Sequence, residues 1–293
     1  MKTQAFPYAE IAPDTYEIGE FDCASMFLII GTEKAMVIDT GIGIGDLKGF
    51  IRKLTDKPLM VCYTHNHVDH VGGAGAFDNA YIHPKDMADF STGGGIGLSI
   101  EGRIWYIKMI AEREKGEYPY NLDVDVTEWG PQPPLYPLED GQVIDLGDRN
   151  VTVTACPGHT TGSICFLDEN SRILFLGDAC NCNLGLGGGA PGTPRFTSIE
   201  KALFYLKRLR SMHDQYDSYY NGHYDFRPLG KPLGEDVLPD AITACEQIVA
   251  GTATVVVKPS PFPNTPKRSV VTVGRTNVSF NPDGIHEPLQ TTQ

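Results

Sequence analysis

The stretch THNHVDH at residues 64–70 decides how this chain is interpreted, because it holds three of only eight histidines in 293 residues. It follows a short apolar run at 59–63 that predicts a buried strand. Residues two apart in an extended chain face the same side, so His65 and His67 can bind one cation. Asp69 and His70 lie where the chain begins to turn and can face a second cation. Imidazole and carboxylate ligands suit zinc, and less selectively iron or manganese.

Composition limits the partners and the compartment. The chain carries 24 basic and 37 acidic residues, a formal charge of −13, whereas binding a nucleic-acid backbone needs basic surface, so no nucleic acid is expected as a partner. Residues 1–20 lack a continuous apolar run, and the longest apolar stretches, such as 26–30, are too short to cross a bilayer. We therefore expect a cytoplasmic protein without membrane contact, a small-molecule substrate, and seven reduced, buried cysteines.

Most of the chain alternates short apolar runs with turn residues, a pattern typical of strands. Strands are predicted at 15–18, 26–30, 35–39, 59–63, 80–82, 142–145, 151–155, 164–168 and 173–177. Helices are predicted at 46–53, where Asp46 is well placed as an N-cap, at 199–208 and at 235–249. Many short strands with few helices predict two sheets packed together with helices outside.

Three regions depart from this rhythm. Residues 84–140 form a long insertion with a helix at 101–115 and a proline-rich stretch at 131–137. This helix is apolar around most of its circumference, so we expect it to contact its own core and also a substrate or the partner subunit of a homodimer. Residues 183–192 are glycine-rich and predict a loop. Residues 250–293 form a C-terminal extension with strands at 253–257 and 269–280, and no linker divides residues 1–293 into separate domains.

The HxHxDH pattern at 65–70 resembles the signature of the metallo-β-lactamase-fold hydrolase superfamily, and four further segments resemble its other motifs in the same order. These segments are VIDTG at 37–41, PGHTTGS at 157–163, LGDA at 176–179 and NGH at 221–223. The resemblance spans residues 37–223. It implies an α+β fold, a four-layer αββα sandwich, with the helical insertion at 84–140.

The resemblance also implies the ligands of a dinuclear metal centre. His65, His67 and His159 would bind the first ion, Asp69, His70 and His223 the second, and Asp178 would bridge the two. The ions would be two divalent metals, with Zn²⁺ favoured over Mn²⁺ or Fe²⁺. They would generate a bridging hydroxide that attacks a carbonyl, and Asp69 could also move a proton to the leaving group.

Other side chains near these motifs are candidates for supporting the ligands or lining the substrate pocket. Asp39 could accept a hydrogen bond from a ligand imidazole or a loop N–H, or it could be a simple turn residue at a strand end. The glycines of 41–45 could suggest a phosphate cradle, but they lack the dinucleotide-binding spacing, so a tight turn is the better account. The candidates for lining the substrate pocket are Trp105, Tyr106, Tyr224, and Asn181 or Asn183.

The predicted activity is hydrolysis of an ester, thioester, lactone or amide of a small molecule. A glyoxalase-II-like thioesterase should carry a basic helical C-terminal region, whereas 235–249 is acidic and predicted strands follow it. A lactonase suits the aromatic residues of the insertion better. The alternative is an iron-dependent oxidoreductase of the same fold, such as a sulfur dioxygenase. A non-catalytic metal-binding protein would lack one or more ligands, and all seven are present.

Overall fold

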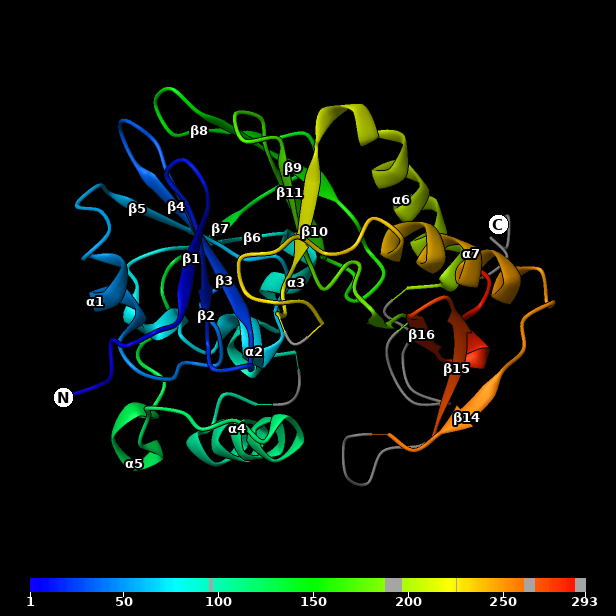
Figure 1. The fold of residues 1–293 in the computed structure, drawn as a ribbon, viewed down its shortest axis with the longest axis horizontal. Helices are drawn as coiled ribbons and strands as arrows, with labels where there is room; N and C mark the ends of the chain where they lie inside the picture. Colours follow the sequence, from blue (N-terminus) through cyan, green and yellow to red (C-terminus); the bar gives the residue numbers. More distant parts are fainter. Residues whose placement is uncertain (95–96, 188–196, 225, 261–266, 288–293) are drawn as a thin grey trace.

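Two β-sheets packed face to face form the centre of the protein (Figure 1). This computed structural model describes residues 1–94, 97–187, 197–224, 226–260 and 267–287. The larger sheet has seven strands in chain order: β1 (Tyr8–Ala12), β2 (Thr15–Gly19), β3 (Ser25–Ile30), β4 (Ala35–Ile38), β5 (Leu59–Cys62), β6 (Ala80–Ile82) and β7 (Leu135–Pro137). The second sheet has five strands in the order β13 (Ser218–Asn221), β11 (Ile173–Gly177), β10 (Ile164–Asp168), β9 (Asn150–Ala155) and β8 (Val143–Asp145).

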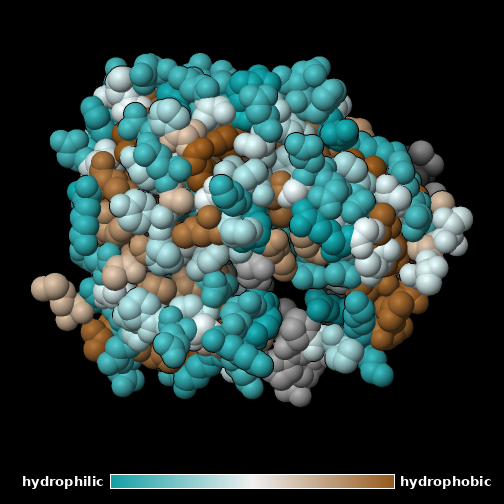
Figure 2. Space-filling model, viewed as in Figure 1, coloured by the Kyte–Doolittle hydropathy of each residue, from teal (hydrophilic) through white to brown (hydrophobic). Residues whose placement is uncertain are grey.

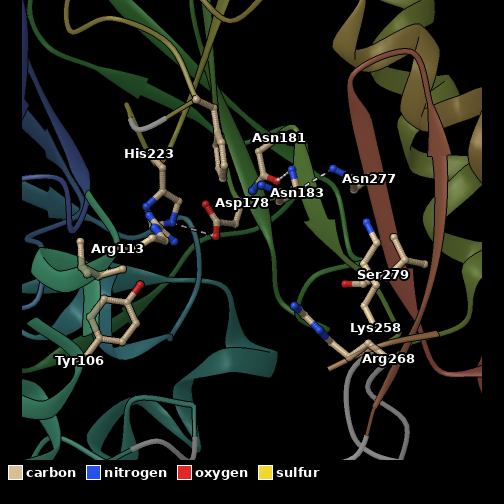
Figure 3. A pocket seen from close by; sticks show the side chains of 13 residues that line it. Tyr106, Arg113, Asp178, Asn181, Asn183, His223, Lys258, Arg268, Asn277 and Ser279 are labelled. Atoms are coloured by element: carbon tan, nitrogen blue, oxygen red, sulfur yellow. Dashed lines mark hydrogen bonds and ion pairs between the residues drawn. The ribbon is translucent and has the colours of Figure 1, made fainter. Parts of the chain in front are cut away.

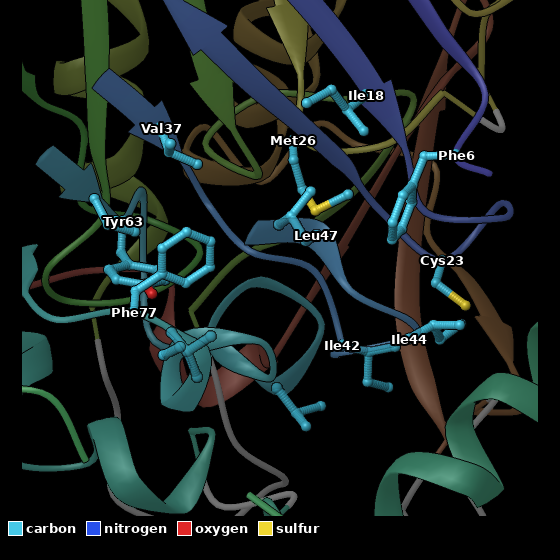
Figure 4. Close-up of a cluster of buried hydrophobic side chains, with 14 of the residues drawn as sticks. Phe6, Ile18, Cys23, Met26, Val37, Ile42, Ile44, Leu47, Tyr63 and Phe77 are labelled. Atoms are coloured by element: carbon cyan, nitrogen blue, oxygen red, sulfur yellow. The ribbon is translucent and has the colours of Figure 1, made fainter. Parts of the chain in front are cut away.

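Alternation along the strands divides the apolar residues between two layers. Successive side chains of a strand point to opposite faces. In β3, Phe27 and Ile29 belong to the core between the two sheets, whereas Met26 and Leu28 belong to the core on the outer face of the larger sheet. Figure 4 shows part of this outer core, to which Met26 contributes from β3. One strand therefore contributes side chains to two apolar cores, one on each face of the larger sheet.

Helices cover the outer face of each sheet and complete the four layers. On the larger sheet lie α1 (Leu47–Ile51), α2 (Val68–Val71) and α4 (Ile100–Glu114), whose apolar residues belong to the outer core. On the second sheet lie α6 (Ile199–Ser211) and α7 (Val237–Val249) (Figure 1). Two further short helices are α3 (Pro84–Met87) and α5 (Leu122–Asp125). The predicted α+β sandwich of αββα type is confirmed.

A third, smaller sheet lies beside α7 and differs from the sequence prediction. Its order is β12 (Asn183–Gly185), β16 (Thr276–Phe280), β15 (Arg268–Val273) and β14 (Val256–Lys258). The strand predicted at 269–280 is two strands joined at Gly274, whose φ of +53° permits the reversal. The loop predicted at 183–192 begins as strand β12, and its residues 188–192 lie outside the described residues. Strand β14 begins at Val256, three positions after the predicted start at 253.

The structure contains a helix at each place where the sequence predicted one, and several local features also agree with the prediction. Helix α1 begins as expected, with the Asp46 side chain accepting a hydrogen bond from the Gly49 N–H at 2.8 Å. The proline-rich stretch at 131–137 ends in β7, an edge strand, where proline is tolerated because one side needs no ladder partner. The seven cysteines are free and buried. Among the described residues, no helix combines the length and apolar character that a membrane crossing requires.

Candidate metal centre

Four loops that follow strands meet at one edge of the sandwich. The loop after β5 carries the histidine cluster at 65–70. The loops after β9, β11 and β13 carry His159, Asp178 and His223. The strands of both sheets therefore deliver side chains from distant parts of the sequence to one place.

The seven predicted ligands form one connected cluster. Three groups of donor atoms each lie within 4.8 Å of one another, and each group could hold a metal ion. The first group is His65, His67 and His159; the second is His65, His70 and Asp178; and the third is Asp69, His70 and His223. His65 belongs to the first two groups and His70 to the last two, which connects all seven residues. The described residues thus bring together every side chain in the predicted set, and their role as ligands stays a prediction that this geometry supports.

Several nitrogen and oxygen atoms of the cluster have no hydrogen-bond partner among the residues that the structure describes and are available to bind metal ions. Within the described part of the chain, His65 Nε2, His70 Nε2 and Asp178 Oδ1 are buried and have no hydrogen-bond partner. A buried polar atom left unpaired is costly, so such atoms need another partner. The Nδ1 atoms of two of the rings are engaged, since His159 Nδ1 donates to the Gly185 carbonyl at 2.9 Å and His70 Nδ1 lies 2.8 Å from Asp39 Oδ2. Each of these two rings therefore presents its Nε2 atom to the cluster, where His159 Nε2 lies 2.9 Å from His67 Nδ1, close enough for both atoms to bind one cation.

Electrostatics within the cluster also suit cation binding. Burial, together with the neighbouring imidazoles, lowers the pKa of His65 well below its usual value and that of His67 to about 3. Both rings are therefore neutral at neutral pH, the form that binds metal. Burial also disfavours a charged His70, but Asp69 and the other carboxylates raise its pKa to about 9. Buried carboxylates thus surround this ring, and divalent ions would balance their charge.

Asp39 lies behind the cluster and holds two of its parts. Its Oδ1 accepts a hydrogen bond from the Thr64 N–H, and its Oδ2 accepts one from the Thr64 hydroxyl, both at 2.8 Å. Oδ2 is also the partner of His70 Nδ1. The φ of Asp39 is +60°, a left-handed conformation that aspartate and asparagine adopt more readily than most residues. Of the two interpretations of Asp39, the structure supports the one that positions a ligand imidazole.

Asp39→Asn is expected to weaken metal binding about 10- to 100-fold, the usual effect of losing a group that orients a ligand. The amide keeps the shape and tolerates the positive φ, but it removes the charge that orients His70. Competition with a chelator of known affinity measures the change. Asp14→Asn is a matched control, because Asp14 also has a positive φ of 55° and is exposed at a turn. Equal metal affinity of the Asp39 variant and wild type would contradict this role.

The glycine segment 41–45 is occupied by the protein's own carboxylate. Glu20 accepts hydrogen bonds from the backbone N–H groups of Ile42 at 2.5 Å and of Gly43 and Ile44 at 2.8 Å. A Cβ added at Gly41 would lie 2.1 Å from Glu20 Oε2, so this position requires glycine. Burial raises the pKa of Glu20 to about 8. The segment is therefore a turn closed by Glu20, which leaves no room for a phosphate.

Asp86 ties the histidine loop to the loop of His159. Its Oδ2 accepts a hydrogen bond from the Thr160 hydroxyl at 2.7 Å, and its Oδ1 accepts one from the Gly162 N–H at 2.8 Å. The Asn66 N–H also donates to Oδ2, at 3.3 Å. This buried carboxylate lies at the start of the insertion at 84–140, and no motif pointed to it.

A cavity of about 320 Å³ opens beside the cluster (Figure 3). Figure 2 shows a hollow on this face, between the surface over α4 and the surface over the small sheet. The described residues that line the cavity are Tyr106, Ile110, Arg113, Asp178, Asn181, Asn183, His223, Phe226, Lys258, Arg268, Val270, Asn277 and Ser279. The cavity is therefore enclosed by the cluster of predicted metal ligands, by α4 and by the small sheet.

Some of the predicted pocket residues line this cavity, and two lie elsewhere. Tyr106, Asn181 and Asn183 line it. Trp105 projects from α4 with 37% of its surface exposed, and it is not among the described lining residues. Tyr224 is also not among the described lining residues; its hydroxyl accepts a hydrogen bond from the Asp22 N–H at 2.6 Å. Sequence position next to a ligand or on the right helix does not determine where a side chain points.

Tyr106 connects α4 to the metal cluster. Its hydroxyl donates a hydrogen bond to Asp69 Oδ2 at 2.6 Å. Burial, with the nearby Asp69 charge, raises the pKa of Tyr106 well above its ordinary value, so the hydroxyl stays protonated and remains a donor. The predicted two-sided helix thus contacts the core through Ile107 and Ile110, and the site through Tyr106.

Comparisons with known proteins agree with this fold and cluster. The family model for the metallo-beta-lactamase superfamily matches residues 19–210. The acyl-coenzyme A thioesterase MBLAC2 of Homo sapiens is 33% identical over 177 residues, which cover 56% of this chain and 60% of that protein. The match therefore spans less than two thirds of the relative's length.

Solved structures show the same fold at low sequence identity. A metallo-beta-lactamase from Pontibacter korlensis superposes with a TM-score of 0.55 at 13% identity, over 82% of this chain and 99% of that one. A metallo-beta-lactamase family protein from Thermus thermophilus gives a TM-score of 0.53 at 20% identity, over 83% of this chain and 82% of that one. With the family match over most of its length and this architecture, the chain belongs to the metallo-beta-lactamase superfamily.

Proposed function

We propose that this chain is a metal-dependent hydrolase that cleaves a thioester of a small molecule. The observation that carries the proposal is the convergence of five imidazoles and two carboxylates, three of whose buried atoms have no hydrogen-bond partner among the described residues. This cluster opens directly into a cavity through Asp178 and His223. A substrate in the cavity would therefore lie against the metal centre.

Two divalent ions bound there would lower the pKa of a coordinated water and polarise a substrate carbonyl. The chain supplies the rest. Burial opposes ionisation of Asp69, but the nearby imidazoles, His70 first, outweigh it and lower the pKa of this carboxyl. The hydrogen bond from Tyr106 fixes its Oδ2, which lies 3.6 Å from His223 Nε2. Asp69 is thus a fixed base that can accept a proton and return it to a leaving group.

A thioester fits the chain better than a lactone. The lactonase prediction depended on the aromatic residues of the insertion. Of the four on which it depended, Trp105, Tyr106, Tyr118 and Tyr120, the described cavity lining includes Tyr106 alone. Tyr118 and Tyr120 stack on each other, with ring centroids 5.5 Å apart, and pack against Phe21. The human and bovine relatives are named acyl-coenzyme A thioesterases. These observations support the thioester.

The test is a substrate panel with one acyl group presented as a thioester, an oxygen ester and a lactone, together with a β-lactam. We expect protein loaded with Zn²⁺ or Mn²⁺ to hold about two ions per chain and to hydrolyse the thioester with the highest kcat/KM. Thiol release measured with a chromogenic reagent gives the rate.

The panel also separates the alternatives. Oxygen uptake by the iron-loaded protein, without hydrolysis of any substrate, would favour an oxidoreductase such as a sulfur dioxygenase. Full metal content without turnover in either assay would favour a non-catalytic metal-binding protein.

A further inference from the structure

One face of the small sheet forms a wall of the cavity. In β16, Asn277 and Ser279 line the cavity, whereas Val278 and Phe280 belong to the apolar core that contains α7. This division follows from strand alternation. In β15, Arg268 lines the cavity on the same basis. Apart from Val270, the described side chains that β14, β15 and β16 contribute to the cavity lining are polar or charged.

Two cations stand directly opposite each other on this wall. Lys258 of β14 is the antiparallel partner of Arg268 of β15, and both line the cavity. Like charges directly opposite each other across two strands destabilise a sheet. Within the part of the chain that the structure describes, neither side chain forms an ion pair with a carboxylate, and Arg268 Nε is buried without a hydrogen-bond partner. Figure 3 shows Arg268 extending into the cavity.

The cavity reverses the charge balance of the chain. The whole sequence has 37 acidic and 24 basic residues. The described lining residues include the cations Arg113, Lys258 and Arg268, and their one carboxylate is Asp178, a predicted metal ligand. Arg113 comes from α4 and is paired with its neighbour Glu114, so the opposed pair on the small sheet is the main source of unbalanced charge.

We propose that Lys258 and Arg268 bind phosphate groups of the substrate while its thioester carbonyl lies at the metal centre. The inference rests on the proposed function and names the substrate class, a thioester whose leaving thiol carries phosphates, as coenzyme A does. A guanidinium offers forked donors to phosphate oxygens, and a lysine adds a point charge. Both residues lie beyond residue 210, where the family match ends, so this subsite belongs to the C-terminal extension of this chain.

The kinetic test compares two thioesters with the same acyl group, one of coenzyme A and one of pantetheine, which lacks the phosphates. We expect Lys258→Gln and Arg268→Gln each to lower kcat/KM for the coenzyme A thioester about 10- to 100-fold, the range for losing one charge-assisted hydrogen bond. The pantetheine thioester has no phosphates for these side chains to bind, so each variant should lose far less kcat/KM on it, and the preference for the coenzyme A thioester should fall. Arg275→Gln is the control, because Arg275 lies on the same hairpin but pairs with Asp236 outside the cavity.

A binding measurement supplies a second readout that needs no turnover. Calorimetry should show that coenzyme A binds the metal-loaded protein more tightly than pantetheine does, and that salt and either variant remove the difference. Lys258 is exposed, so Lys258→Gln tests the subsite even if Arg268→Gln fails to fold.

Three results would overturn the phosphate subsite. The first is that each variant loses the same factor in kcat/KM on both thioesters. The second is that the wild-type protein binds coenzyme A no more tightly than pantetheine. The third is that hydrolysis of a glutathione thioester, which carries carboxylates and no phosphates, depends equally on Lys258 and Arg268. If neither thioester is hydrolysed but coenzyme A still binds in a manner that depends on Lys258 and Arg268, the subsite stands and the proposed hydrolysis fails.

Discussion

Replacing Asp178 with alanine is expected to remove metal binding and thioester hydrolysis together. Asp178 Oδ2 lies 3.2 Å from His223 Nε2 and 3.7 Å from His159 Nε2. Its Oδ1 lies 3.8 Å from His70 Nε2. The carboxylate thus stands between the two groups of imidazoles, where a shared ligand would have to lie. Losing several kcal/mol of transition-state stabilisation lowers kcat/KM about a thousandfold.

Elemental analysis and thiol release on the same preparation measure both parts of this prediction. Asn181→Ala is the control, because Asn181 lines the same cavity but belongs to none of the donor groups, so this variant should keep its metal. An Asp178→Ala protein that retains two ions and normal turnover would show that Asp178 does not bridge the metals.

Replacing Arg227 with methionine is expected to lower the free energy of unfolding by about 3–5 kcal/mol, because it leaves a buried carboxylate without its cation. Glu17 and Arg227 are both buried, with Arg227 Nη1 2.9 Å from Glu17 Oε2 and Nη2 2.7 Å from Oε1. The guanidinium also lies 4.8 Å from the centre of the Tyr220 ring. Methionine can fill the space but cannot satisfy the charge.

Urea unfolding followed by circular dichroism measures the loss as a lower midpoint at constant slope. Arg172→Met is the matched control. Arg172 pairs with Asp217 at 2.9 Å, but the two side chains are 41% and 69% exposed, so solvent screens the pair and its loss should lower the midpoint far less. Similar midpoints for the two variants would mean that the buried pair contributes no more than a surface pair.

Local patterns in the sequence predicted the parts of the fold that depend on near neighbours. Short apolar runs separated by turn residues identified β3 and β4, and a capping aspartate identified the start of α1. The histidine cluster pointed to a metal site, since its residues are adjacent in the chain. The resemblance to the superfamily's motifs then added His159, Asp178 and His223, which the structure places after strands β9, β11 and β13 at the same edge.

The remaining features depend on contacts between residues far apart in the sequence. Glu20 closes the turn at 42–44, and Asp86 binds the loop at 160–162, but nothing near either residue indicates its partner. Lys258 and Arg268 became a pair only through the register of β14 and β15. One signal was available: the alternation of polar and apolar residues at 276–280 predicts a strand with one wet face.

The division of the donor atoms between the two sheets also affects how long the protein survives. The loop after β5 of the larger sheet carries one set of donors, and loops after β9, β11 and β13 of the second sheet carry the other. Ions held by both sets would act as cross-links, present in the folded chain and absent from the unfolded one. Binding at a hundredfold excess over Kd adds about 2.7 kcal/mol to stability. Protein that lacks these ions would therefore unfold more readily and be cleaved faster by a protease than protein that holds them.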